Sequence, residues 1–174
     1  YFRVHSLPGA ASRWEFTTGV VGAYAHGTVS REYLFLQAVY FSKWFSMYAT
    51  QDVDFNRDWK VDVAGQDAVE PTATLASLRV HAAKWLDLTA GYDDRRNVYL
   101  YRDFVTPLTV FDDGNRQGDW AGASFRFGGH ADLGVEARES RGGPPGISNS
   151  YSLNVGAERF TRANFGVRLR GTHF

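Results

Sequence analysis

The chain has 174 residues, equal numbers of basic and acidic side chains (19 Lys and Arg against 19 Asp and Glu) and no cysteine. This length is sufficient for one domain, and the charge balance excludes the basic face that a nucleic-acid partner would need. The lack of cysteine excludes disulfides, thiolate metal sites and cysteine nucleophiles, and no run approaches the ~18 apolar residues of a membrane helix.

Apolar residues alternate with polar or small ones along most of the chain, which is typical of β-strands with one apolar face. The alternation predicts about ten strands, over residues 1–7, 13–26, 32–41, 44–55, 72–82, 85–102, 116–127, 130–139, 149–158 and 164–174. Short and long connections follow one another in turn, except at HGTVSR, and this order indicates an antiparallel up-and-down meander. We therefore expect residues 1–174 to form a single all-β domain.

Aromatic residues gather at the ends of the predicted strands. One group lies near the short turns and another near the long loops: Trp14, Phe41, Trp44, Trp85, Phe127 and Phe160 in the first, and Tyr24, Tyr33, Tyr92, Tyr99, Tyr101 and Tyr151 in the second. Two aromatic bands are expected where a barrel crosses the two interfaces of a membrane. The opposite, polar face carries small residues and charges of both signs with few lysines, which suits a hydrated interior.

On these features the chain resembles bacterial outer-membrane β-barrels. The resemblance implies an antiparallel, up-and-down transmembrane β-barrel of about ten strands, or a piece of a longer chain that forms a larger barrel. It also implies a location in the bacterial outer membrane, in contact with the lipid bilayer. The expected function is a channel or porin-like pore, or the membrane anchor of a larger assembly with other envelope proteins or further subunits, and not an enzyme.

Charged residues fall on the polar face because they occupy the same alternate positions of the predicted strands as the other polar residues. These candidate lumen-lining residues are Glu15, Arg79, Asp87, Arg126, Asp132, Glu136, Arg138, Glu158, Arg168 and Arg170. They are interpreted either as a salt-bridge network that fills a narrow barrel or as the lining of a selective pore.

Two other classes of function stay open at this point. A soluble β-barrel would turn the apolar face inward and bind an apolar ligand there. A hydrolase with its site at the rim of a membrane barrel would use His26 together with Asp52 or Asp93.

The stretch QDVDFNRDWKVD resembles part of a calcium-binding loop. Asp54, Asn56, Asp58 and Asp62 occupy its first, third, fifth and ninth places. The sixth place, which requires glycine for a sharp turn, is Trp59, and the twelfth, which requires a bidentate glutamate, is Gly65. The sequence therefore predicts a strand that runs into a loop and, at most, a weak calcium site, with no other cofactor.

Overall fold

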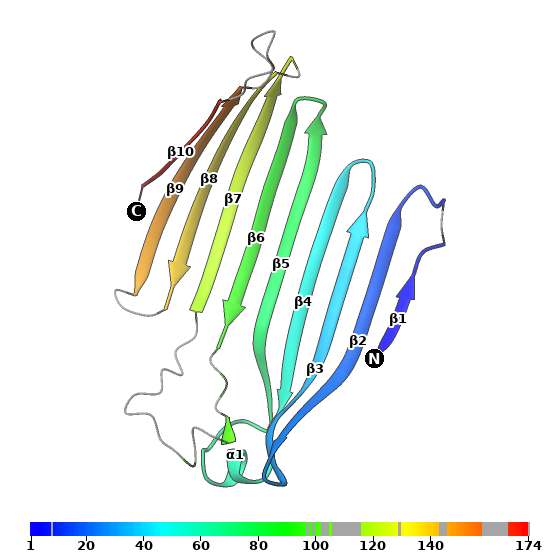
Figure 1. Cartoon of the computed structure of the whole chain (residues 1–174), viewed down its shortest axis with the longest axis vertical. Coiled ribbons are helices and arrows are strands. Elements are labelled where there is room, and N and C mark those ends of the chain that lie inside the picture. Colours follow the sequence, from blue (N-terminus) through cyan, green and yellow to red (C-terminus); the bar gives the residue numbers. More distant parts are fainter. Residues whose placement is uncertain are drawn as a thin grey trace.

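The computed structural model describes residues 1–7, 9–96, 98, 100, 101, 105, 116–128, 130–142, 146–157 and 167–173. These residues form one antiparallel sheet in which ten strands follow one another in chain order, together with a short helix at one end (Figure 1). The elements are β1 (Phe2–His5), β2 (Arg13–Ala25), β3 (Thr28–Phe41), β4 (Phe45–Phe55), α1 (Trp59–Asp62), β5 (Val69–Ala83), β6 (Leu86–Arg95), β7 (Arg116–Phe127), β8 (Ala131–Arg141), β9 (Ile147–Ala157) and β10 (Val167–His173). The predicted all-β meander is confirmed.

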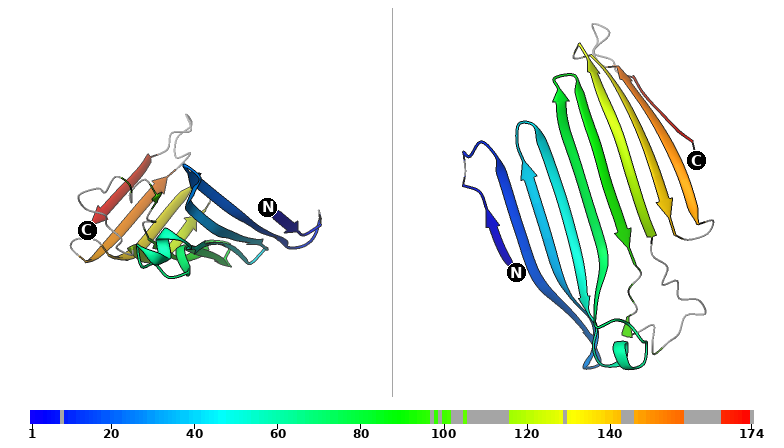
Figure 2. Two further views of the ribbon diagram at one scale, coloured as in Figure 1. Left: turned by 90° about the horizontal axis from the view of Figure 1, so that it is seen from below. Right: turned by 180° about the vertical axis from the view of Figure 1, so that it is seen from behind.

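The sheet is open, so the prediction of a closed ten-stranded barrel is wrong for the described residues. Its strand order ends at β1 and β10, which do not pair with each other. Both edges bend toward the same side, and the sheet forms a trough (Figure 2). Alternation specifies amphipathic strands and local pairing, whereas closure depends on strand number and shear, which alternation does not encode.

The pairing register keeps like residues together on each face. Ala123 of β7 lies opposite Leu88 and Val135, whereas its neighbour Ser124 lies opposite Asp87 and Gly134. The same correspondence holds from β1 to β10 and assembles one continuous apolar face. Its larger members are Phe2, Val4, Trp14, Phe16, Val20, Leu34, Leu36, Tyr40, Phe45, Met47, Leu78, Val80, Leu86, Leu88, Phe125, Phe127, Leu133, Val135, Leu153, Val155, Val167 and Leu169.

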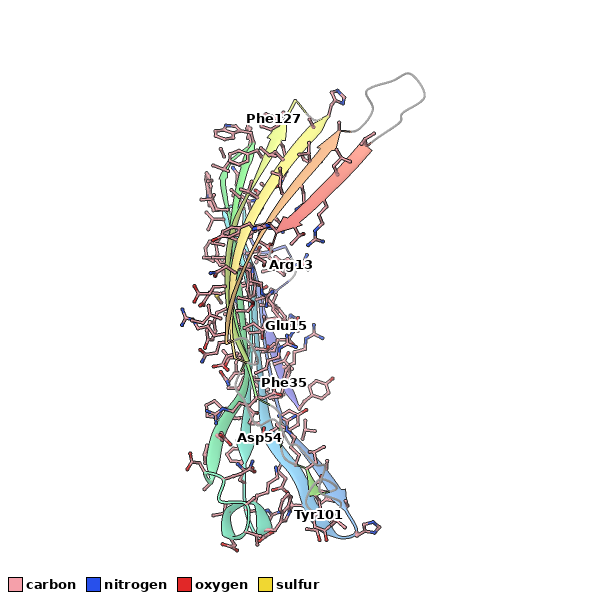
Figure 3. All side chains as sticks on the ribbon, turned by 90° about the vertical axis from the view of Figure 1, so that its left-hand side faces the viewer. Arg13, Glu15, Phe35, Asp54, Tyr101 and Phe127 are labelled. Carbon is pink, nitrogen blue, oxygen red and sulfur yellow. The ribbon has the colours of Figure 1, made fainter. Side chains whose placement is uncertain are left out.

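The apolar face is the convex side of the trough and the polar face is the concave side. Seen from the β10 edge, Phe127 lies on the convex side and Glu15 on the concave side (Figure 3). Among the described residues the only buried hydrophobic side chains are Val29 and Trp59, and no second layer covers the convex face. No helix in this part of the chain is long and apolar enough to cross a membrane.

The β2–β3 connection is a two-residue hairpin turn. The alternation of short and long connections along the chain would have placed a long loop here. His26 and Gly27 have φ angles of 51° and 77°, the left-handed conformations that a tight turn between twisted strands requires. Strand β3 consequently begins at Thr28, before the predicted start at residue 32. Strand β6 is shorter than predicted and ends at Arg95.

Candidate functional site

The concave face holds a hollow of about 600 Å³ above the middle strands of the sheet. Polar side chains from β4 to β9 line it. The pairing register aligns the six strands so that the alternate residues with polar side chains all face this side. They include Ser46, Tyr48, Ser77, Arg79, Thr89, Trp120, Ser124, Asp132, Glu136 and Asn154. This hollow is the candidate functional site.

Glycines in the floor of the sheet make room for its large side chains. The indole of Trp120 lies over Gly91, where a Cβ would come 1.9 Å from the ring. The carboxylate of Asp132 lies over Gly156 in the same way, with a Cβ only 2.3 Å from Oδ1. Each glycine therefore allows its neighbour to lie down against the backbone, so that a broad aromatic or charged surface faces the hollow.

Many charges of the concave face are neutralised in pairs. His81 Nδ1 lies 2.6 Å from Oδ1 of the buried Asp87, whose Oδ2 accepts a hydrogen bond from Arg126. Arg3 donates to Glu15 at 2.5 Å. The buried charge of Asp87 is tolerated because it has these partners, whereas the Arg3–Glu15 pair is exposed.

The register places the candidate lumen-lining residues on the concave face, apart from Glu158, which lies outside the described residues. Arg168 and Arg170 are placed by their positions in β10, opposite Gly156 and Asn154. Arg138 reaches to 3.8 Å from Asp93 and lies 5.4 Å from the centre of the Trp120 ring. The remaining two, Arg79 and Glu136, line the hollow and form no ion pair within the described part of the chain.

A second polar cluster lies at the end of the sheet that carries α1, and we call it the rim cluster. The fully buried Asp54 receives two hydrogen bonds from Arg31, both of 2.8 Å, and one from the Thr72 hydroxyl at 2.6 Å. Such a bidentate, charge-assisted arrangement has a defined geometry. It therefore ties β3, β4 and β5 together where the strands leave the regular sheet.

Helix α1 packs against the same end of the sheet through two buried side chains. The Trp59 indole N–H donates to the Val29 carbonyl at 2.7 Å, and its ring lies 5.8 Å from that of Tyr101. Lys60 is fully buried, and its Nζ donates to Asn56 Oδ1 at 3.4 Å. Burial lowers the pKa of Lys60 because the charged ammonium loses its hydration.

The residues of the predicted calcium loop do not converge on one point. Asp54 is bonded to Arg31 and Thr72, and Asn56 Oδ1 accepts from Lys60. Asp58 and Asp62 are exposed. The described residues contain no group of three or more His, Asp or Glu side chains that could hold a metal ion. The physical reason lies at Trp59, which packs inward where a calcium loop has its glycine turn.

The geometry also separates His26 from Asp52, one of its two candidate partners in the predicted rim hydrolase. Asp52 lies opposite Phe35, seven residues along β3 from Thr28, whereas His26 lies in the turn before Thr28. At about 3.3 Å per residue this separation is roughly 20 Å. Asp52 instead faces Arg31, with an N–O distance of 3.4 Å.

Sequence reasoning missed the rim cluster, because Arg31 and Thr72 are 41 residues apart and only the register brings them together. Tyr48 and Trp120 could be placed on the polar face from the sequence, since they alternate with the apolar residues of their strands. Comparison of the chain with protein families, curated proteins and solved structures finds no match.

Proposed function

We propose that the chain forms part of the wall of a bacterial outer-membrane β-barrel, with its convex face against lipid and its concave face lining a hydrated lumen. The observation that carries the proposal is the uncovered apolar face, which extends across all ten strands. Val20, Phe127 and Leu169 on this face are 73%, 54% and 65% exposed. An apolar surface of this extent is abnormal for a protein in water and is the expected surface of one in lipid.

The dimensions of the face support the same assignment. Uninterrupted segments such as Leu86–Tyr92, Ala121–Phe127 and Ala131–Ala137 carry no Asp, Glu, Lys or Arg at the positions that face outward. Each covers about 20 Å along its strand, which approaches the ~25 Å apolar band of outer-membrane barrels. Tyr92 lies at one end of the band and Phe127 at the other, as expected of interfacial aromatic residues.

The direction of curvature favours the membrane barrel over a soluble barrel with an apolar ligand inside. The soluble alternative needs the apolar face to be concave, and here that face is convex (Figure 3). The small and charged side chains of the concave face are instead suited to a water-filled interior.

The open edges support a larger wall. An unpaired strand edge in lipid leaves backbone N–H and C=O groups unsatisfied, at a cost of several kcal/mol each. We infer that further strands pair with β1 and β10. Because neighbouring strands alternate in direction, β1 and β10 run antiparallel to each other, and a meander that bridges them must add an even number of strands.

Purification and electrical recording of the full chain test the proposal. We expect the protein to require detergent, because lipid or detergent must cover the convex face. A monodisperse preparation in plain buffer would contradict the membrane assignment. In a planar bilayer, discrete conductance steps indicate a pore, whereas insertion without conductance indicates the membrane anchor of an assembly with other envelope proteins or subunits. We assign no enzymatic activity to the chain.

A further inference from the structure

The hollow on the concave face combines hydroxyl groups, an amide and three aromatic side chains. Salt bridges that only stiffen the sheet would not require this set of neutral polar and aromatic groups. Ser77, Thr89 and Asn154 offer groups that can both donate and accept hydrogen bonds. The volume of about 600 Å³ lies within the range of about 300–1,000 Å³ that is usual for small-molecule sites.

Trp120 provides an aromatic surface at the floor of this hollow. Its indole is held over Gly91, where any side chain would collide with the ring. Arg138 borders the ring from β8, with its guanidinium 5.4 Å from the ring centre. The indole is partly exposed, so a ligand in the hollow can reach it. Phe41 and Tyr48 add two further exposed aromatic rings on the same side of the sheet.

The charges of the hollow favour a ligand without net charge. The charged residues that line the hollow are Arg79, Asp132 and Glu136, and Asp132 has an interaction partner of its own. Arg79 and Glu136 are both exposed, and neither forms an ion pair within the described residues. An anion attracted by Arg79 is repelled by Glu136, and the reverse holds for a cation. An apolar ligand would leave the hydroxyl, amide and charged groups unpaired, which costs free energy.

We infer that the hollow binds a neutral polyhydroxylated solute, that is, a sugar or short oligosaccharide. The weakly positive C–H groups of a sugar ring pack against the electron-rich face of Trp120. The sugar hydroxyls accept from Arg79, donate to Glu136 and exchange hydrogen bonds with Asn154. This inference rests on the proposed function, because a site on the concave face meets solutes only if that face lines a hydrated lumen.

Titration of tryptophan fluorescence with maltotriose, on the full chain in detergent, tests the site. We expect a saturable change in the wild type, with sodium gluconate, an anionic polyol, producing a much weaker response. Trp120→Leu should abolish the signal and weaken binding measured by calorimetry about tenfold or more, which corresponds to about 1.4 kcal/mol. Trp85→Phe is the matched control, since Trp85 is exposed at a short turn and is not among the residues that line the hollow; it should keep both signal and affinity.

Glu136→Ala provides an independent test if Trp120→Leu does not fold. Glu136 is exposed, so its removal should leave the fold intact while maltotriose affinity falls and gluconate binding becomes stronger. An unchanged maltotriose affinity in both variants, or a wild type that shows no saturable response, overturns the sugar site. Either result is distinguishable from failure of the proposed function, which would appear as a protein that is monodisperse without detergent and does not insert into bilayers.

Discussion

The lipid-facing role of the convex face predicts a specific response to one charged substitution, Leu78→Lys. Leu78 lies in the middle of β5, between Met47 of β4 and Ala90 of β6, and its side chain is 40% exposed. No described element packs over it, so the substitution leaves the contacts within the sheet largely intact. Its effect therefore reports mainly on the medium that covers the face.

The two possible media give well-separated magnitudes. A lysine near the midplane of a bilayer, on the outside of a β-barrel, costs about 2–4 kcal/mol. A lysine at a part-exposed position in water changes stability by about 0.5 kcal/mol or less. Ser77, the neighbouring residue, points to the concave side, so Ser77→Lys should cost much less than Leu78→Lys in a membrane barrel.

The free energy of unfolding can be measured by urea titration of the full chain folded into phospholipid vesicles. We expect Leu78→Lys to lower it by about 2–4 kcal/mol and Ser77→Lys by less than about 1 kcal/mol. Equal losses in the two variants, or a loss below about 1 kcal/mol for Leu78→Lys, would refute the assignment of the convex face to lipid.

Three further predictions concern the rim cluster, helix α1 and the edges of the sheet. Arg31→Met leaves the buried Asp54 without its cation, so the rim should lose about 3–5 kcal/mol, seen as faster hydrogen exchange of residues 56–68; unchanged exchange would show that Asp54 is not desolvated. Because burial lowers the pKa of Lys60, the unfolded chain binds more protons between that lowered pKa and the ordinary value of 10.5, so stability should rise with pH across this interval. Urea titrations at several pH values should show the rise in the wild type and a flatter profile in Lys60→Met; identical profiles would count against the burial of Lys60. The chain lacks cysteine, so a pair introduced by Arg3→Cys and Arg170→Cys reports only on the two edges. We expect no disulfide when further strands separate β1 from β10, whereas an efficient disulfide would show that the two strands pair directly.

Most of the secondary structure could be predicted from the chain, because alternation is a local property of each strand. Ala123 and Ser124 are adjacent in a strand, so they could be assigned to opposite faces before any pairing was known. Strand β7 has the predicted bounds. Helix α1 could not be predicted in this way. It is four residues long and depends on Trp59 reaching the Val29 carbonyl, a contact between residues 30 apart in sequence.

Only part of the candidate site could be predicted from the sequence. Parity assigned Arg79, Trp120 and Glu136 to the polar face, but their convergence on one hollow requires the registers of the intervening strands. The calcium prediction at Asp54 was based on spacing along the chain. Spacing along the chain could not show that Arg31, from another strand, supplies a positive charge beside Asp54.

Alternation along the chain is enough to establish a meander of amphipathic strands with one apolar and one polar face, since side chains in a strand alternate regardless of what the strand pairs with. The assembled sheet is needed to show that the apolar face is convex, that the sheet is open at β1 and β10, and that Asp54 pairs with Arg31. Curvature, closure and ion pairing depend on register, bulges and twist accumulated over many strands. None of these is a property of a single stretch of sequence.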